Sequence, residues 1–161
     1  MSDSSTLHAI SPIDGRYRRH TEPLAPYFSE AGLIQYRVRV EVEYFIALHA
    51  VGLPQLPALT ATQVEGLRSI YVGFSEADAQ AVKDIERTTN HDVKAVEYFI
   101  KDKLKDHGLE GRSEFVHFGL TSQDVNNTAI PLSMMEATTD VLLPLMQQTR
   151  EDLHALAEQW A

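Results

Sequence analysis

The chain has 161 residues, 43% of them hydrophobic, which suits one globular domain or slightly more. Its formal net charge of −9 argues against a nucleic acid or an anionic membrane as a partner. The chain has no cysteine, so disulfides and thiolate metal sites are excluded, and this composition is typical of a cytoplasmic protein. The polar first residues do not resemble a signal peptide, and no apolar run reaches membrane-spanning length.

The first motif, residues 11–19, combines a predicted turn with a basic cluster. A proline and an Asp-Gly pair indicate the turn, and Arg16 follows it beside Tyr17 and two further arginines. Arginine forks match the oxygens of phosphate and carboxylate groups in bidentate fashion. The motif therefore predicts an anion-binding arm, although a solvated basic surface is the simpler alternative.

Helical patterns dominate the chain after this motif. Residues 37–43 alternate like a strand, but the longer apolar stripe around them favours a helix. Thr60 with Gln63, or Thr62 with Glu65, fits a capping box for one helix start, and Ser75 with Asp78 resembles another capped start. No segment is a convincing strand, so we expect an all-α fold. The predicted helices cover residues 29–51, 60 to about 71, a segment that begins at 75 and precedes Asn90, residues 90–108, and residues 122–161.

One predicted helix start, at residues 88–97, carries several polar side chains. Asn90 is expected to be the N-cap, and Asp92 lies in the first turn, where negative charge is favoured. His91 is placed at the same end. Free N–H groups and the helix dipole make such an end suitable for an anion. A capped helix without chemistry is the simpler alternative.

A second helix start follows at residues 115–128. Thr121 and Asp124 have capping-box spacing, and Gly119 permits a close backbone approach just before the helix. Thr121 and Ser122 therefore place two hydroxyls and several free N–H groups at a second anion-ready end. His117 lies beside phenylalanines and is a weaker candidate, because it suits a half-buried packing residue.

The pattern from residue 122 onward is long for one globular helix. Pro131 and Pro144 are expected to bend it, and neither a cap nor a stop precedes Ala161. We therefore expect the natural chain to continue. We divide the sequence into an N-terminal helical domain, residues 1–111, and the start of a central helix-bundle domain, residues 112–161.

Motifs for cofactor chemistry are missing from the sequence. It contains no glycine-rich phosphate loop, no nucleophile elbow and no His-Glu-x-x-His pair. We expect neither a cofactor nor a bound metal.

Three segments together resemble the adenylosuccinate lyase family of the fumarase/aspartase superfamily, in its bacterial form. They are Ser-Pro-Ile-Asp-Gly-Arg-Tyr at residues 11–17, the block around Thr-Thr-Asn-His-Asp at 85–99, and the block ending in Thr-Ser-Gln-Asp at 114–124. The resemblance covers essentially the whole chain. It implies a small N-terminal helical domain followed by the first long helix of a central bundle, which four subunits share in a homotetramer.

The resemblance also implies a reaction. Members of this family release fumarate by β-elimination, from adenylosuccinate to give AMP and from the succinylated aminoimidazole carboxamide ribotide, in the purine pathway that makes IMP and AMP. Arg16 and Tyr17 would hold the nucleotide, and Asn90, His91 and Asp92 would line the pocket beside the reacting C–N bond. His91 would have a supporting catalytic role.

Thr121 and Ser122 would receive a succinyl carboxylate, on which charge develops as the neighbouring carbon loses its proton. The family's principal general acid and base would both follow residue 161, so we expect this chain alone to be inactive. Two alternatives remain: a sister eliminase, such as argininosuccinate lyase or fumarase, or a helical assembly module without catalysis.

Overall fold

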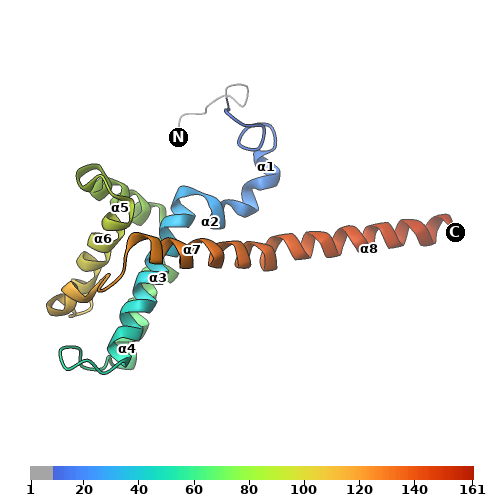
Figure 1. Cartoon of the computed structure of the whole chain (residues 1–161). Coiled ribbons are helices and arrows are strands. Elements are labelled where there is room, and N and C mark those ends of the chain that lie inside the picture. The colour runs from blue at the N-terminus through green and yellow to red at the C-terminus, as the bar shows by residue number, and fades with distance from the viewer. Residues whose placement is uncertain (1–8) are drawn as a thin grey trace. The chain divides into compact units, whose positions relative to one another are not determined.

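The computed structural model describes residues 9–161, in which the regular elements are all helices, joined by turns and loops (Figure 1). No strand occurs among these residues, and the predicted all-α class is confirmed. The elements are α1 (Arg18–Thr21), the 3-10 helix η2 (Glu22–Leu24), α2 (Ala25–Phe28), α3 (Glu30–Ala50), α4 (Ala61–Val72), α5 (Glu76–Thr89), α6 (Asp92–Asp106), the 3-10 helix η3 (Glu110–Phe115), α7 (Ser122–Ala137), the π-helical turn η4 (Thr138–Leu142) and α8 (Leu143–Trp160).

The chain forms two compact units. The first unit comprises the chain up to Ser29 together with Met134–Ala161, and the second unit is Glu30–Ser133. The predicted division at residues 111 and 112 stays a prediction.

The hydrophobic core of the second unit lies where α3, α4, α5 and α6 pack together. On α6 the apolar residues Val93, Val96, Phe99, Ile100 and Leu104 are spaced along one helix face and are all buried. Removing these side chains from water is the main stabilising contribution to the unit, at roughly 25 cal/mol per Å² of apolar surface. The fully or almost fully buried core residues include Val38, Val42, Phe45, Leu67, Val82, Val93, Val96, Ile100 and Leu104.

Capping boxes begin α4 and α5, as the sequence predicts. The Thr60 hydroxyl accepts a hydrogen bond from the Gln63 N–H, and the Gln63 side chain accepts one from the Thr60 N–H. Ser75 and Asp78 make the same reciprocal pair. Each box satisfies backbone donors that a helix start otherwise leaves unpaired.

The junction between α5 and α6 differs from the prediction. Asn90 is not the N-cap of α6, because it adopts the left-handed conformation, with φ of 50°, and ends α5. Asparagine tolerates this conformation better than most residues do. His91 is the N-cap of α6 instead, with extended backbone angles. Two helices therefore follow each other with only two residues between them.

The region after Ser122 remains helical as far as Trp160, but its geometry changes along the way. Pro131 lies inside α7, and a π-helical turn over Thr138–Leu142 separates α7 from α8. Pro144 stands in the first turn of α8, where its ring has no N–H to donate and crowds the carbonyl four residues earlier. The wider π-helical turn just before Pro144 relieves this crowding.

In the first unit, the short helices α1, η2 and α2 follow one another almost without interruption. The Tyr27 hydroxyl donates a hydrogen bond to Asp140 Oδ2 at 3.1 Å, which joins α2 to the π-helical turn. None of the helices formed by residues 9–161 is long and apolar enough to cross a membrane.

Candidate functional site

The start of α6 is built around His91. Its Nδ1 accepts a hydrogen bond from the Lys94 N–H at 3.1 Å and so caps the helix. Because this nitrogen acts as the acceptor, the ring proton of the neutral imidazole belongs on Nε2. The side chain is 49% exposed, so the N–H on Nε2 is a donor at the surface of the second unit.

The start of α7 meets this donor. The Asp124 carboxylate accepts hydrogen bonds from the Thr121 N–H at 2.7 Å and from the Thr121 hydroxyl at 2.8 Å. Ser122 Oγ lies 3.2 Å from His91 Nε2. The structure therefore brings the two helix starts together through a direct contact between side chains 31 positions apart.

Asp92 is held firmly at the first position of α6. Its Oδ1 accepts from the Val93 N–H at 2.8 Å, and its Oδ2 lies 2.7 Å from Arg37 Nη2. Burial acts to raise the pKa of Asp92, but the Val93 hydrogen bond and the Arg37 guanidinium together hold it below its usual value. Asp92 is therefore a carboxylate fixed in position by α3.

Two predicted substrate-binding groups take no part in the contact between His91 and Ser122. Asn90 contributes to a pocket of about 520 Å³, together with Lys83 and Arg87 of α5. Arg16 and Tyr17 belong to the first unit, where the Arg16 guanidinium stacks 4.6 Å from the centre of the Tyr17 ring and also donates to its hydroxyl. The structure joins His91, Asp92 and Ser122 within the second unit.

A buried acidic residue, Glu41 of α3, was missed by the sequence analysis. It is fully buried and pairs through Oε1 with His117 Nδ1. Burial raises the pKa of Glu41 above its usual value, against the hydrogen bond with His117, which acts to lower it. Among the described residues, Glu41 Oε2 is one of two buried side-chain atoms without a hydrogen-bond partner.

The pair of Glu41 and His117 shapes the segment that leads into α7. His117 has a φ of 61° and Gly119 has a φ of 73°, so the backbone enters the left-handed region twice within three residues. His117 adopts this conformation at a cost that its contacts must offset. The Tyr44 hydroxyl also donates to the Phe118 carbonyl at 2.8 Å. His117 is thus a partly buried residue that anchors this segment to α3.

Arg37 was also missed as a residue of interest, although a signal was present. It and Glu41 are one helical turn apart on α3, a helix whose apolar residues indicate burial on several sides. Charged residues within such a pattern are rarely buried without partners. The spacing could have singled them out, but not the partners, which lie 55 and 76 positions further along the chain.

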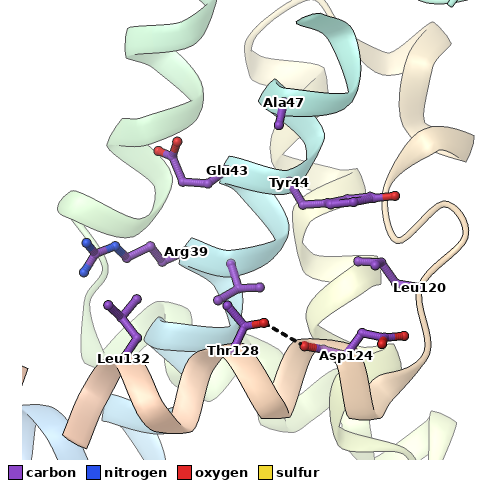
Figure 2. A pocket seen from close by; sticks show the side chains of 9 residues that line it. Arg39, Glu43, Tyr44, Ala47, Leu120, Asp124, Thr128 and Leu132 are labelled. Atoms are coloured by element: carbon purple, nitrogen blue, oxygen red, sulfur yellow. Dashed lines mark hydrogen bonds between the residues drawn. The ribbon is translucent and has the colours of Figure 1, made fainter. Parts of the chain in front are cut away.

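Beside the α7 start lies an open pocket of about 460 Å³ between α3 and α7 (Figure 2). In Figure 2, Arg39, Glu43 and Tyr44 come from α3, and Asp124 and Thr128 come from α7, with the Thr128 hydroxyl donating to the Asp124 carbonyl. None of the predicted site residues lines this pocket. It is therefore separate from the contact between His91 and Ser122.

No group of three or more histidine or carboxylate side chains in the described residues is arranged to hold a metal ion. The chemistry available at the two helix starts is that of hydrogen-bond donors, one imidazole and two fixed carboxylates, Asp92 and Asp124. Such groups bind and orient an anionic substrate and can take part in proton transfer.

Comparison with known proteins defines the class to which this helical chain belongs. A protein-family model described as lyase matches residues 15–161, which is nearly the whole chain. The chain therefore belongs to this family of lyases.

The similar curated proteins are adenylosuccinate lyases. The chain is 53% identical over 163 residues to that of Dictyostelium discoideum, covering 97% of this chain and 34% of the relative. It is 45% identical over 159 residues to that of Escherichia coli strain K12, and 44% identical over 158 residues to that of Vibrio cholerae, in both cases covering 97% of this chain and 35% of the relative. The chain thus spans about a third of the length of the curated relatives it matches.

Proposed function

We propose that the protein containing this chain is an adenylosuccinate lyase of purine biosynthesis. It cleaves a C–N bond of adenylosuccinate by β-elimination to give AMP and fumarate, and acts likewise on the succinylated aminoimidazole carboxamide ribotide. The relatives named adenylosuccinate lyase support this assignment. The contact between His91 Nε2 and Ser122 Oγ carries it structurally, because it unites two helix starts that suit a substrate with several anionic groups.

In this proposal the reaction removes a proton from the carbon next to a succinyl carboxylate, and the C–N bond pair leaves with the nitrogen, which takes up a proton. Thr121 and Ser122 bind that carboxylate, where negative charge builds up in the transition state. Donors fixed at this point lower the barrier because they bind the transition state more strongly than the ground state.

The remaining predicted residues bind other parts of the substrate. Asn90, His91 and Asp92 line the pocket beside the C–N bond, and Arg16 and Tyr17 hold the nucleotide. The Nε2–H of His91 orients the substrate or supports proton transfer, while the principal acid and base come from residues that this chain does not contain. We therefore propose that this chain does not sustain turnover on its own.

We also propose that the complete enzyme is a cytoplasmic homotetramer in which α8 joins a bundle of helices from several subunits. A row of apolar side chains on α8 supports this arrangement, since Leu153 is 63% exposed and Trp160 78% exposed. The absence of cysteine fits a reducing compartment.

The test is fumarate release from adenylosuccinate by the complete natural protein, followed by its ultraviolet absorbance. Thermal stabilisation by AMP, arginine and fumarate separates this enzyme from its sister eliminases, because a ligand at 100 times its Kd stabilises the native state by about 2.7 kcal/mol. We expect turnover and stabilisation by AMP. Stabilisation by arginine without turnover of adenylosuccinate would assign the protein to a sister activity, and sustained turnover by residues 1–161 alone would refute the proposed incompleteness.

A further inference from the structure

We propose that Arg37 is a positioning residue that fixes the start of α6 against the start of α7. The inference rests on the proposed function, because it assigns Arg37 the task of holding His91 and Ser122 in the geometry that the elimination needs. Arg37 itself lies behind them on α3 and has no part in binding the substrate.

The contacts of Arg37 join three helices. Its Nη2 lies 2.7 Å from Asp92 Oδ2 at the first position of α6, and its Nε donates to Asn126 Oδ1, in the second turn of α7, at 2.9 Å. His91 precedes Asp92 directly, and Ser122 lies one turn before Asn126. One guanidinium group therefore sets the separation of the two helix starts whose side chains meet at 3.2 Å.

Burial restricts the Arg37 guanidinium to the partners that the fold places around it. The Arg37 residue is only 6% exposed, so its charge has few partners other than those that the fold provides. A guanidinium group is planar and carries its donors in a rigid fork, so it fixes the relative positions of two acceptors, which the single ammonium group of lysine does less well. A second polar anchor stands one turn further along α3, where Glu41 holds His117 and the segment leading into α7.

The exposed arginine of α4 offers a matched control. Arg68 also pairs with a carboxylate of α3, with its Nε 2.7 Å from Glu43 Oε1, but its side chain is 49% exposed. Its pair joins α3 to α4 and reaches neither of the two helix starts. Arg68→Gln therefore removes an arginine–carboxylate pair of the same kind without loosening the contact between His91 and Ser122.

Kinetics of the complete natural protein test the inference. A displacement of about 1 Å in a catalytic arrangement costs on the order of a hundredfold in rate. We expect Arg37→Gln to lower kcat for fumarate release about a hundredfold, with a much smaller change in KM, because the misplaced groups act on the transition state. The kcat of Arg37→Lys should be about tenfold higher than that of Arg37→Gln. The kcat of Arg68→Gln should stay within about twofold of the natural value.

Amide hydrogen exchange gives a second readout that does not depend on activity. Arg37→Gln should speed exchange in the first turns of both α6 and α7, whereas Arg68→Gln should leave both unchanged. If Arg37→Gln does not fold, Arg37→Lys and the milder Asn126→Ala decide by the same two measurements.

The two proposals fail in different ways. The positioning role is overturned if the folded Arg37 variants and Asn126→Ala match Arg68→Gln in both kcat and exchange. If exchange changes as expected but the natural protein releases no fumarate from adenylosuccinate, the bridge stands and the proposed function falls.

Discussion

At the scale of single residues, His91 uses its two ring nitrogens for different purposes. Nδ1 accepts the Lys94 N–H and caps α6, while Nε2 faces Ser122 Oγ. An unpaired backbone donor at a helix start costs stability, so the cap alone would explain a histidine here. A substitution at position 91 that keeps the helix cap but loses the contact with Ser122 can separate the structural role of His91 from its chemical role.

His91→Asn makes that separation. Asparagine is among the best N-cap residues, so we expect the free energy of unfolding to stay within about 0.5 kcal/mol of the natural value. Its short side chain cannot also reach Ser122, and we expect fumarate release by the complete protein to fall at least about a hundredfold, the scale of one positioned proton-transfer group. Urea melts and initial rates measure the two effects. Unchanged rates in His91→Asn would leave His91 as a cap only.

The contributions of two glutamates on α3, Glu41 and Glu43, to stability should change with pH in opposite directions. Burial raises the pKa of Glu41 above its reference value of 4.5, so its contribution to stability is fully present below that value and is lost as pH rises through the folded pKa. The hydrogen bond from Arg68 lowers the pKa of Glu43 below its reference value. Burial acts to raise this pKa, and the hydrogen bond from Tyr71 also lowers it. Its contribution is present above 4.5 and is lost as pH falls through the folded pKa.

We therefore expect the free energy of unfolding of Glu41→Gln to increase relative to that of the natural chain as pH rises from 4 to 7. Glu43→Gln should become less favourable when pH rises from 3 to 5. Free energies of unfolding measured in urea across these ranges provide the check. Parallel pH profiles for the two variants would contradict the opposite shifts.

At the scale of elements, the starts of α4 and α5 in the second unit are capped by side chains close by in the sequence. Ser75→Ala removes one half of the capping box that begins α5, and we expect it to lower the free energy of unfolding by about 1 kcal/mol. Ser69→Ala is the control, because the Ser69 hydroxyl only donates to the Gly66 carbonyl within α4. Urea melts compare the two variants, and an equal loss in both would show that the cap contributes nothing beyond the loss of a hydroxyl.

How far the sequence predicts the structure depends on the range of the interaction. Each capping box, at Thr60 and at Ser75, lies within four consecutive residues, so the starts of α4 and α5 could be predicted from local sequence. Asn90 has the composition of an N-cap, but packing α5 against α6 requires a left-handed residue at the junction and gives the cap to His91. The partners of Arg37 and Glu41 depend on how α3 packs against distant segments, which no local pattern records.

The residues of the candidate site also differ in how far local patterns determine them. Local patterns placed His91, Ser122 and Thr121 at or next to helix starts, because caps and first turns have characteristic residues. That the starts of α6 and α7 meet follows from tertiary packing and was expected only through the resemblance to a known family. The π-helical turn over Thr138–Leu142 was indicated only indirectly, by the proline that follows it.

At the scale of the whole molecule, α8 carries an unusual amount of exposed apolar surface. Among its apolar residues, Leu145, Met146, Leu153 and Trp160 are all more than half exposed. A water-exposed stripe of this kind at helical spacing is typical of a surface that another helix covers. Under the proposed function, the covering helices come from other copies of the same protein.

Leu153→Glu tests this assembly. Burying a carboxylate in an apolar helix interface is unfavourable unless it finds a partner, so we expect the complete protein to shift from a tetramer towards smaller species in sedimentation. Ala155→Glu adds the same charge among Arg150, Glu151 and His154, on the opposite side of α8, and should leave the tetramer intact. A Leu153→Glu protein that remains tetrameric, or a natural protein that sediments as a monomer, would show that this stripe does not form the subunit interface.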